Sequence, residues 1–480
     1  MDHILYWNAV ALEANRRDFT DVPTGQTKPM PEQGGPTLSS RALAIVHLAM
    51  YDAHAGVVGG ANLPPYLAPA PPLVPGSSAA AAVAMAAYTT LKNLYPRQQS
   101  QFDAAMVGAQ LSGAGVADGM AFGQAVAGAI LADRGADPGA GAAGYTPSNA
   151  PFRHRPDPVN AGQGFHAPFY GKMSKCFAVQ VRQSLDSPFA APNQYPASVK
   201  QVLAKGIAPD LAASVSASDR RTPEETLTAF FWAYDGPRNL GTPPRFFNQI
   251  VRQVAMEKGN SVDDNARLFA LVNAAMGDAG ILAWQEKYKW DLWRPVVGIR
   301  EHDPSMGPSA PVPGSSLDDH CDPEWRPLGA PASNLPVNST ERDFTPPFPA
   351  YPSGHATFGA AALHMTRLFY GTPVGDRKKD THITGPVVSD ECNGITADSK
   401  GVVRTRHARL FSKGLWQMIV ENGLSRVFLG VHWSLDAFAL KANGEPDWTR
   451  DMLGGAPLGL RIAEDMWQFG NKKGPKKSAV

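Results

Sequence analysis

Residues 348–370 read FPAYPSGHATFGAAALHMTRLFY, and this stretch indicates both a type of fold and a type of site. Proline and glycine fill its first part, and an apolar, alanine-rich run with helical spacing follows His355. We expect an ordered loop that leads into the first turn of a helix, where unpaired amides and the helix dipole favour an anion. Gly354 permits close backbone approach, Ser353 adds a hydroxyl donor, and His355 can give or take a proton near neutral pH. The alternative is an ordinary serine-capped helix with a surface histidine.

Helical spacing dominates the rest of the chain, and alternating, strand-like runs are scarce. We expect a mainly α protein made of two packed helical bundles with long loops rich in proline and glycine. The predicted helices cover residues 41–55, 77–94, 98–110, 116–134, 222–234, 244–258, 262–293, 356–370, 405–421 and 431–442. The hydroxyls of residues 37–40 are expected to cap the first of them. The predicted loops cover residues 62–76, 137–171 and 303–352, and their aromatic residues suggest that they pack on the body.

The chain divides, on this interpretation, into an N-terminal helical bundle with loops (1–220), a C-terminal bundle that carries the active site (221–470) and a disordered basic tail (471–480). A short pattern is repeated between the two halves. Ser40-Arg41, His47 and Asp52 resemble Ser425-Arg426, His432 and Asp436. A duplicated bundle with one active half would produce this repeat, and so would chance matches between short helices.

Charge and hydropathy exclude several classes of partner. The 480-residue chain is long enough to bury one large core or two packed ones, and its formal net charge is +1. Nothing in that balance favours nucleic acid or a charged membrane as partner. No apolar run of about 18 residues is present, so no membrane span is expected. The first residues lack the features of a secretory signal, which leaves a cytoplasmic protein or a non-standard route of export.

The chain has three cysteines, Cys176, Cys321 and Cys392, which are far apart in the sequence. They show no CxxC or Cys/His spacing of the kind that binds zinc or an iron–sulfur cluster. We expect free thiols, with one disulfide as the alternative.

A second segment, KYKWDLWRP at residues 287–295, carries Lys287 and Arg294 seven positions apart. On a continuous helix this spacing corresponds to about 700°, so both cations would lie on one face. Trp284, Trp290 and Trp293 crowd the same stretch, whereas a solvated basic face rarely carries so much aromatic surface. A bound anion would neutralise the pair. The alternative is a basic face in contact with solvent.

A third segment, SRVFLGVHWSLD at residues 425–436, places His432 and Asp436 on one helix face. A carboxylate that accepts the Nδ1 proton leaves Nε2 free as a nucleophile or a ligand. Arg426 would point elsewhere on a straight helix, so we expect a break near Gly430 and His432 in the first turn after it. A purely structural His–Asp pair is the alternative. Together, the three segments offer the donors and acid–base groups that a tetrahedral oxyanion needs.

The combination of K-x6-RP, PSGH and SR-x5-H-x3-D resembles the signature shared by vanadium-dependent haloperoxidases and the acid phosphatases of the phosphatidic acid phosphatase superfamily. The segments FFWAYDG (230–236), GTPPRFFNQI (241–250), TPPFPAYPSGHATFG (345–359) and VRTRHAR (403–409) are more similar to the vanadium chloroperoxidase branch. The resemblance spans most of the chain and is weakest in the loops.

This resemblance implies a bound vanadate cofactor and a role for each signature residue. The residues implied to bind the vanadate oxygens are Lys287, Arg294, Ser353, Gly354 and Arg426. His432 would be the sole protein ligand of vanadium, with Asp436 orienting its ring and Asp235 as acidic partner of the arginines. His355 would serve as the acid–base group. Trp284 and Phe348 match positions that line the halide pocket of chloroperoxidases.

The activity implied is the oxidation of chloride or bromide by hydrogen peroxide, with vanadium(V) as a Lewis acid that keeps its oxidation state. Lys287 would polarise the peroxide by hydrogen bonding, and hypohalous acid would halogenate small organic acceptors outside the pocket. One alternative is a soluble acid phosphatase in which His432 forms a phosphohistidine. Another is a noncatalytic helical scaffold that binds anions. Related enzymes include monomers and larger assemblies, so homo-oligomer formation stays open.

Overall fold

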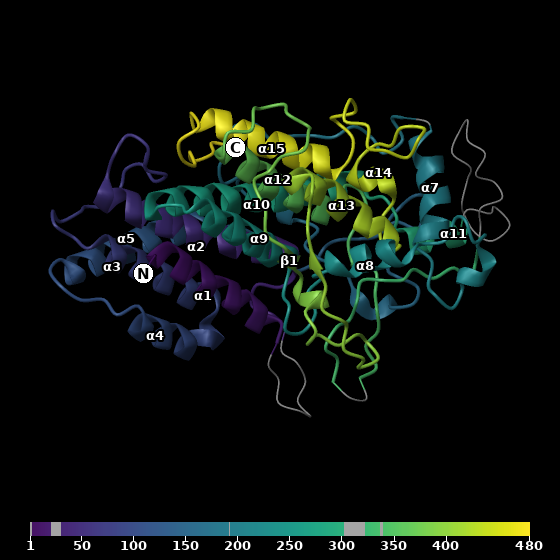
Figure 1. The fold of residues 1–480 in the computed structure, drawn as a ribbon, viewed down its shortest axis with the longest axis horizontal. Coiled ribbons are helices and arrows are strands. Elements are labelled where there is room, and N and C mark those ends of the chain that lie inside the picture. Colours follow the sequence, from purple (N-terminus) through teal and green to yellow (C-terminus); the bar gives the residue numbers. More distant parts are fainter. Residues whose placement is uncertain (1, 21–29, 192, 302–321, 337–338) are drawn as a thin grey trace.

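A computed structural model of the protein describes residues 2–20, 30–191, 193–301, 322–336 and 339–480, which fold into packed helices joined by long loops (Figure 1). The helices up to residue 220 are α1 (His3–Asp18), α2 (Gly35–Val58), α3 (Ala79–Leu94), η1 (Pro96–Gln98), α4 (Gln99–Gly108), α5 (Val116–Asp133), η2 (Ala161–Gln163), α6 (Tyr170–Met173), α7 (Gln194–Lys205) and η3 (Ala212–Ser214). Those that follow are α8 (Pro223–Phe231), α9 (Pro243–Lys258), α10 (Val262–Trp290), α11 (Pro295–Glu301), α12 (Gly354–Phe369), η4 (Asp390–Cys392), α13 (Gly414–Phe428), α14 (Ser434–Ala437) and α15 (Gly455–Phe469). The strands β1 (Val387–Val388) and β2 (Ala408–Arg409) pair antiparallel, with Val387 opposite Arg409.

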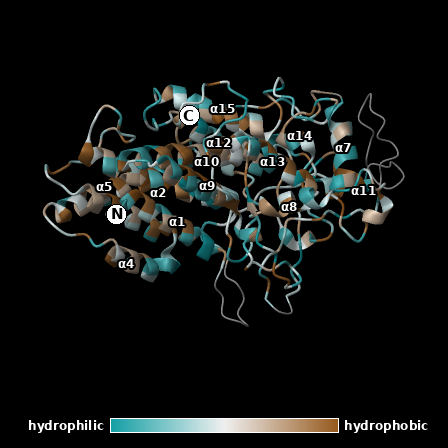
Figure 2. Ribbon diagram, in the orientation of Figure 1, coloured by the Kyte–Doolittle hydropathy of each residue, from teal (hydrophilic) through white to brown (hydrophobic). Residues whose placement is uncertain are grey.

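The long helix α10 is the centre of the molecule. It begins at a capping box, in which the Ser261 side chain and Asp264 satisfy each other's backbone amides. It packs against α2 of the N-terminal half and against α12 and α15 of the C-terminal half, so it joins the two groups of helices. Figure 2 shows hydrophobic residues concentrated on α2 and α10. The site described below lies where α10 and α12 meet the loops.

Contrary to the expectation from the sequence that no stretch is long and apolar enough to cross a membrane, α10 could do so by length and composition, and it is the one helix in the described ranges of which this is true. However, 94% of its most apolar 18-residue window is buried inside the protein. Burial of this kind is typical of the central helix of a folded core, so α10 alone is weak evidence for a membrane span.

Helices α3 and α5 pack unusually closely because glycines face α3. A Cβ atom on Gly123 would lie 2.1 Å from the carbonyl oxygen of Ala82, and one on Gly119 would lie 2.4 Å from that of Ser78. Backbone atoms cannot move aside as the end of a flexible side chain can. The close contact between these two helices therefore depends on Gly119 and Gly123 having no side chain.

Gly123→Ala is expected to destabilise the protein by about 1–3 kcal/mol, because the added methyl group pushes α3 and α5 apart. Gly128→Ala is a matched control on the same helix, since a Cβ there meets nothing within 4 Å. That control should keep or raise stability by up to about 1 kcal/mol through better helix propensity. Urea unfolding followed by circular dichroism measures both, and equal stability of the two variants would mean that the helices are not in close contact.

Most predicted helices are confirmed with small shifts of their ends, but three are wrong in extent. The helix predicted for residues 262–293 ends at Trp290, where Asp291 takes a left-handed conformation with φ 53°. The helix predicted for 405–421 is displaced to α13, because its first residues form β2 instead. The helix predicted for 431–442 shrinks to the four residues of α14. Helices α1, α6, α7, α11 and α15 were not predicted.

The cap predicted at residues 37–40 is also wrong. Helix α2 begins earlier, at Gly35, with Pro36 in its first turn. The Ser39 hydroxyl donates to the Gln33 carbonyl at 2.9 Å, and the Ser40 hydroxyl donates to the Thr37 carbonyl at 2.9 Å, so neither caps a backbone amide.

The basic tail, predicted to be disordered, packs on the N-terminal half. The Cys176 amide donates to the carbonyl of Val480 at 2.8 Å, and the Ser478 amide donates to that of Phe177 at 2.9 Å. Lys477 forms an ion pair with Asp133 at 2.8 Å. The tail pairs with the backbone of another loop, a long-range contact that its composition does not reveal.

Two other predictions concern side chains of the loops. Tyr170 and Trp325 are fully buried, which confirms that the loops pack on the body. Cys176 and Cys392 are buried free thiols, whereas Cys321 lies outside the described residues, as does the part of the third predicted loop from 303 to 321.

Candidate active site

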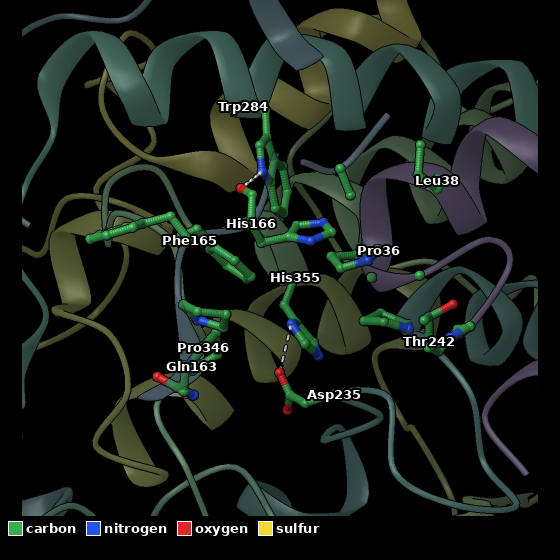
Figure 3. A pocket seen from close by; sticks show the side chains of 18 of the residues that line it. Pro36, Leu38, Gln163, Phe165, His166, Asp235, Thr242, Trp284, Pro346 and His355 are labelled. Carbon is green, nitrogen blue, oxygen red and sulfur yellow. Dashed lines mark hydrogen bonds and ion pairs between the residues drawn. The ribbon is translucent and has the colours of Figure 1, made fainter. Parts of the chain in front are cut away.

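A cavity of about 470 Å³ is lined by several of the site residues that the sequence predicted (Figure 3). It lies between the start of α2, the loops around Phe165 and Phe348, and the first turn of α12. Its polar lining residues are Gln163, His166, Asp235, Thr242, His355, Arg426 and His432. Residues from both halves of the chain therefore form its wall.

The first turn of α12 is built as the PSGH motif predicts. Ser353 is the N-cap, and its Oγ accepts a hydrogen bond from the Ala356 amide at 3.3 Å. The Ser353 amide donates to the Asp436 carbonyl at 2.7 Å, which ties this turn to α14. Since the cap uses Oγ as an acceptor, the hydroxyl proton of Ser353 is still available to a ligand.

Lys287 and Arg294 come together by a different route from the one predicted. Lys287 lies on the last turns of α10, whereas Arg294 lies beyond the helix end, immediately before Pro295 of α11. A residue before proline is disfavoured in a helix, so one helix face could not carry both cations. Both side chains are fully buried behind the cavity wall and are not among its lining residues.

Backbone carbonyls orient these two cations. The Lys287 ammonium donates to the carbonyls of Pro349 at 2.8 Å and Ala350 at 3.1 Å, which leaves one of its three N–H groups free. Arg294 donates through Nε to the Phe348 carbonyl at 2.8 Å and through Nη1 to the Val431 carbonyl at 2.7 Å. Its buried Nη2 has no hydrogen-bond partner in the described residues.

His432 and Asp436 form the predicted pair, although His432 is not in a helix. The predicted break is present, since α13 ends at Phe428 and Gly430 has φ 72°, but His432 lies in the connection before α14. Its Nδ1 donates to Asp436 Oδ2 at 2.8 Å. Its Nε2 lies 2.9 Å from Arg294 Nη1, which can only donate, so Nε2 is the unprotonated nitrogen with a lone pair facing the guanidinium.

Arg426 and His355 meet at Asp235. Arg426 makes a bidentate pair with Asp235, with distances of 3.0 Å from Nη1 and 2.7 Å from Nη2, and its buried Nε has no partner in the described part of the chain. His355 Nδ1 lies 3.9 Å from Asp235 Oδ1 (Figure 3). The Nε2 of His355 donates to the Ala233 carbonyl. In the neutral ring, Nδ1 therefore carries the lone pair and can accept a proton.

Burial makes the positive charges of this site costly. Burial, and after it the charge of Arg294, hold the pKa of Lys287 well below its usual value. Burial and the surrounding cations likewise hold the pKa of His432 well below its usual range. Burial and Arg426 lower the pKa of His355 to about 3, so this imidazole is neutral at physiological pH. Burial raises the pKa of the Asp436 carboxyl, which disfavours the negative charge next to His432. An anion bound among these groups would raise the pKa values of the cationic side chains again.

The polar groups that the sequence did not predict are mostly backbone carbonyls, together with the lining side chains of Gln163, His166 and Thr242. The carbonyls of Ala233, Phe348, Pro349, Ala350 and Val431 orient the predicted side chains, and a backbone group leaves no signal in side-chain patterns. His166 lines the cavity but belongs to no motif. In the N-terminal repeat, His47 donates through Nδ1 to the Leu43 carbonyl and accepts at Nε2 from the Asn8 side-chain amide, and Asp52 accepts from the amides of Tyr66 and Leu67. Those residues do not reproduce the His–Asp pair of the active half.

The fold and the site define a helical protein with buried cationic donors around two histidines, an arrangement that suits an oxyanion. Residues 1–163 match the family model of the vanadium chloroperoxidase N-terminal domain, and residues 267–446 match that of the VCPO second helical-bundle domain. The vanadium chloroperoxidase of Curvularia inaequalis is 33% identical, over 99% of this chain and 91% of that protein. The chain therefore belongs to the vanadium chloroperoxidase family of vanadium-dependent haloperoxidases, which use vanadate as cofactor.

Solved structures share the fold at lower sequence identity. A bacterial vanadium-dependent iodoperoxidase aligns with TM-score 0.60 and 20% identity, over 98% of this chain and 97% of that chain. A holo-type bacterial vanadium-dependent chloroperoxidase aligns with TM-score 0.59 and 16% identity, over 95% and 96% of the two chains. These alignments confirm the mainly helical architecture.

The side chains present fit vanadate. The free N–H groups, Arg294 Nη2 and Arg426 Nε, are buried donors that an oxyanion would satisfy. The described residues contain no group of three or more His, Cys, Asp or Glu that could hold a bare metal cation. A site with one unprotonated imidazole nitrogen and several cationic donors suits an oxyanion of a metal better than the metal ion itself.

Proposed function

We propose that Lys287, Arg294, Ser353, Gly354 and Arg426 bind the oxygens of vanadate and that His432 Nε2 is its single protein ligand. The observation that carries this assignment is the pair of buried, unpartnered arginine donors beside an unprotonated imidazole nitrogen, His432 Nε2, whose lone pair faces only the Arg294 guanidinium among the described residues. Asp436 fixes the His432 tautomer through its bond to Nδ1, and Asp235 holds Arg426 in a bidentate pair. Bound vanadate supplies Lewis-acid activation of hydrogen peroxide toward halide.

His355 is the proposed proton acceptor for hydrogen peroxide. Its Nε2 is committed to the Ala233 carbonyl, so the proton is taken at Nδ1, which faces Asp235 at 3.9 Å. The carboxylate stabilises the imidazolium once it forms. Lys287 has one N–H free after binding two carbonyls, and we assign this group to the peroxide oxygen that the halide attacks.

Trp284 and Phe348 form the proposed halide site. Their rings lie 4.8 Å apart, and the Lys287 ammonium lies 5.5 Å from the centroid of Trp284 and 5.1 Å from that of Phe348. A largely buried pocket between two aromatic rings and the Lys287 ammonium suits a halide ion. We propose that the enzyme oxidises chloride as well as bromide, because position 348 carries a phenylalanine and not an ionisable side chain such as histidine.

The vanadate-loaded enzyme is expected to turn over both bromide and chloride with hydrogen peroxide, and to lose both activities when vanadate is removed by dialysis against phosphate. Bleaching of monochlorodimedone measures both reactions. Phe348→His should lower the ratio of chloride to bromide turnover about tenfold, the usual size of the effect of one altered pocket contact. Bromide and iodide turnover without any chloride turnover would contradict the proposed preference. Hydrolysis of p-nitrophenyl phosphate in place of peroxidase activity would instead support the acid phosphatase alternative.

A further inference from the structure

The cavity is much larger than the reactants of halide oxidation require. Its volume is about 470 Å³. Vanadate, hydrogen peroxide and a halide ion together need about the room of six water molecules, at roughly 30 Å³ per water. Most of the cavity is therefore available to another molecule, and its size falls within the range of pockets that hold organic ligands.

The walls of this extra space are apolar and largely aromatic. Residues that form them include Phe19, Leu38, Phe165, Pro346, Pro347 and Phe358, which come from α2, α12 and three loops. Figure 3 shows Leu38, Phe165, Pro346 and Trp284 arranged around the space that His355 faces. Small hydrophilic reactants gain nothing from such walls, whereas a flat aromatic molecule buries apolar surface against them.

His166 places one hydrogen-bonding group in this apolar part of the cavity, and its backbone is firmly held. Its amide donates to the Pro347 carbonyl at 2.9 Å, and its carbonyl accepts from Tyr288 Oη at 2.7 Å and from Trp284 Nε1 at 3.3 Å. The ring packs against Trp284 and Phe348, with centroids 6.0 Å from each. The imidazole is thus positioned next to the proposed halide site.

The hydrogen bonds of Thr37 determine which nitrogen of His166 carries the proton. Thr37 is fully buried, and its Oγ1 lies 2.9 Å from His166 Nε2. This is the one hydrogen bond of the Thr37 side chain among the described residues, and we assign the buried hydroxyl as its donor, because its proton would otherwise have no acceptor, so Nε2 accepts. Burial lowers the pKa of His166 to about 4, so the ring is neutral and its single proton is on Nδ1. No group in the described ranges bonds to Nδ1, which makes it a free donor on the cavity wall.

We propose that the cavity binds an aromatic acceptor of one or two rings that bears a phenol or enol oxygen, and that His166 Nδ1–H donates a hydrogen bond to this oxygen. The acceptor is then halogenated inside the cavity, next to the place where hypohalous acid forms. This inference rests on the proposed function, which supplies the hypohalous acid. It differs from the expectation, drawn from the family resemblance, that halogenation takes place outside the pocket.

The halogenation step is balanced without any further oxidant. An electron pair of the aromatic ring forms the new carbon–halogen bond, and the oxygen–halogen bond of hypohalous acid breaks, with its electron pair going to oxygen. The ring carbon then loses its proton, which combines with the hydroxide to give water. Peroxide has already oxidised the halide, so each equivalent of peroxide yields one carbon–halogen bond.

The test compares the products of 1-naphthol bromination by the vanadate-loaded enzyme and by free hypobromous acid. A bound acceptor should give a ratio of 2-bromo to 4-bromo product at least about threefold different from that of the free reagent, and a rate that saturates with 1-naphthol. Leu38→Trp, which fills the cavity, and His166→Phe, which keeps a ring and removes the donor, should both move the ratio toward the free-reagent value. Because the ratio is independent of the amount of bromide oxidised, it reports on the acceptor site alone.

Matched controls keep the comparison specific. Leu410→Trp changes a leucine that is 69% exposed, and His407→Phe changes a histidine that does not line the cavity, so both should keep the wild-type ratio. Saturation-transfer NMR with 1-naphthol, in the absence of peroxide, tests binding to the wild-type enzyme even if one variant fails to fold. A wild-type ratio equal to that of free hypobromous acid, with no saturation transfer, overturns the inference.

Triiodide formation from iodide and peroxide separates this result from a failure of the proposed function. The iodide assay needs no organic acceptor. If triiodide forms only with vanadate while the naphthol products match the free reagent, the acceptor site is wrong and the proposed function stands. If no vanadate-dependent triiodide forms, the proposed function fails, and the inference fails with it.

Discussion

His432→Ala is expected to weaken vanadate binding strongly and to lower bromide oxidation by about 10³-fold or more, the upper end of the range for removing one stabilising group. The variant loses the only imidazole nitrogen in the site with a lone pair directed at Arg294, 2.9 Å away. The arginines can still attract an oxyanion, so weak binding of phosphate or vanadate should persist without turnover. Equilibrium dialysis with vanadium analysis measures binding, and the bromination assay measures activity.

Two further variants show whether that loss is specific. Asp436→Asn keeps an acceptor for the Nδ1 proton but removes the charge, so we expect a smaller loss of about 10–100-fold. His47→Ala removes the equivalent histidine of the N-terminal repeat, which bonds to Asn8 and Leu43 and is not a lining residue of the cavity. It should leave peroxidase activity intact in the folded protein. Unchanged activity in His432→Ala would exclude His432 as the vanadium ligand.

The parts of the site that the sequence predicts best are those whose geometry is local. The PSGH motif gives a helix N-terminus because Ser353 caps the amide of a residue three positions away. The predicted His432–Asp436 contact is present although only Asp436 is helical. The turn that leads into α14 brings residues four positions apart as close together as a regular helix would. In both cases the contact is made by neighbours along the chain.

For Lys287 and Arg294, local helical geometry does not explain why the two side chains lie close together. Helical spacing predicted the correct neighbours for the wrong reason, since α10 ends at Trp290 and the chain turns at Asp291 before reaching Arg294. A left-handed residue without glycine leaves little trace in a sequence. The two cations instead meet because the backbone from Phe348 to Ala350 supplies carbonyls to both.

Long-range contacts account for the remaining differences. His166 reaches the cavity because Tyr288 and Trp284, more than a hundred positions away, hold its carbonyl. The tail residues pack because a distant loop, at Cys176 and Phe177, offers them backbone partners. Neither contact follows from local propensity, so each needed the tertiary structure.

Asp235→Ala is expected to destabilise the enzyme without vanadate by about 3–5 kcal/mol, the range for breaking a buried ion pair on one side. The pair is bidentate, and the side chains of Arg426 and Asp235 are 0% and 6% exposed, so water cannot replace the lost carboxylate. Urea unfolding followed by circular dichroism measures the loss. A loss below about 1 kcal/mol would mean that Arg426 finds another counter-charge.

Two further measurements test whether the unpaired charge of Arg426 causes that loss of stability. One uses the double variant Asp235→Ala/Arg426→Met, and the other uses added vanadate. Removing both charges should restore most of the stability, because no unpaired ion is left buried. It should not restore peroxidase activity, since Arg426 Nε is one of the two free donors of the site. Vanadate at a fixed concentration of about 100 times the wild-type dissociation constant should add about 2.7 kcal/mol to a variant that keeps the wild-type affinity, and less to one that binds vanadate more weakly. The single variant Asp235→Ala should therefore gain from vanadate, because the oxyanion takes over part of the role of the carboxylate, whereas the double variant should gain much less.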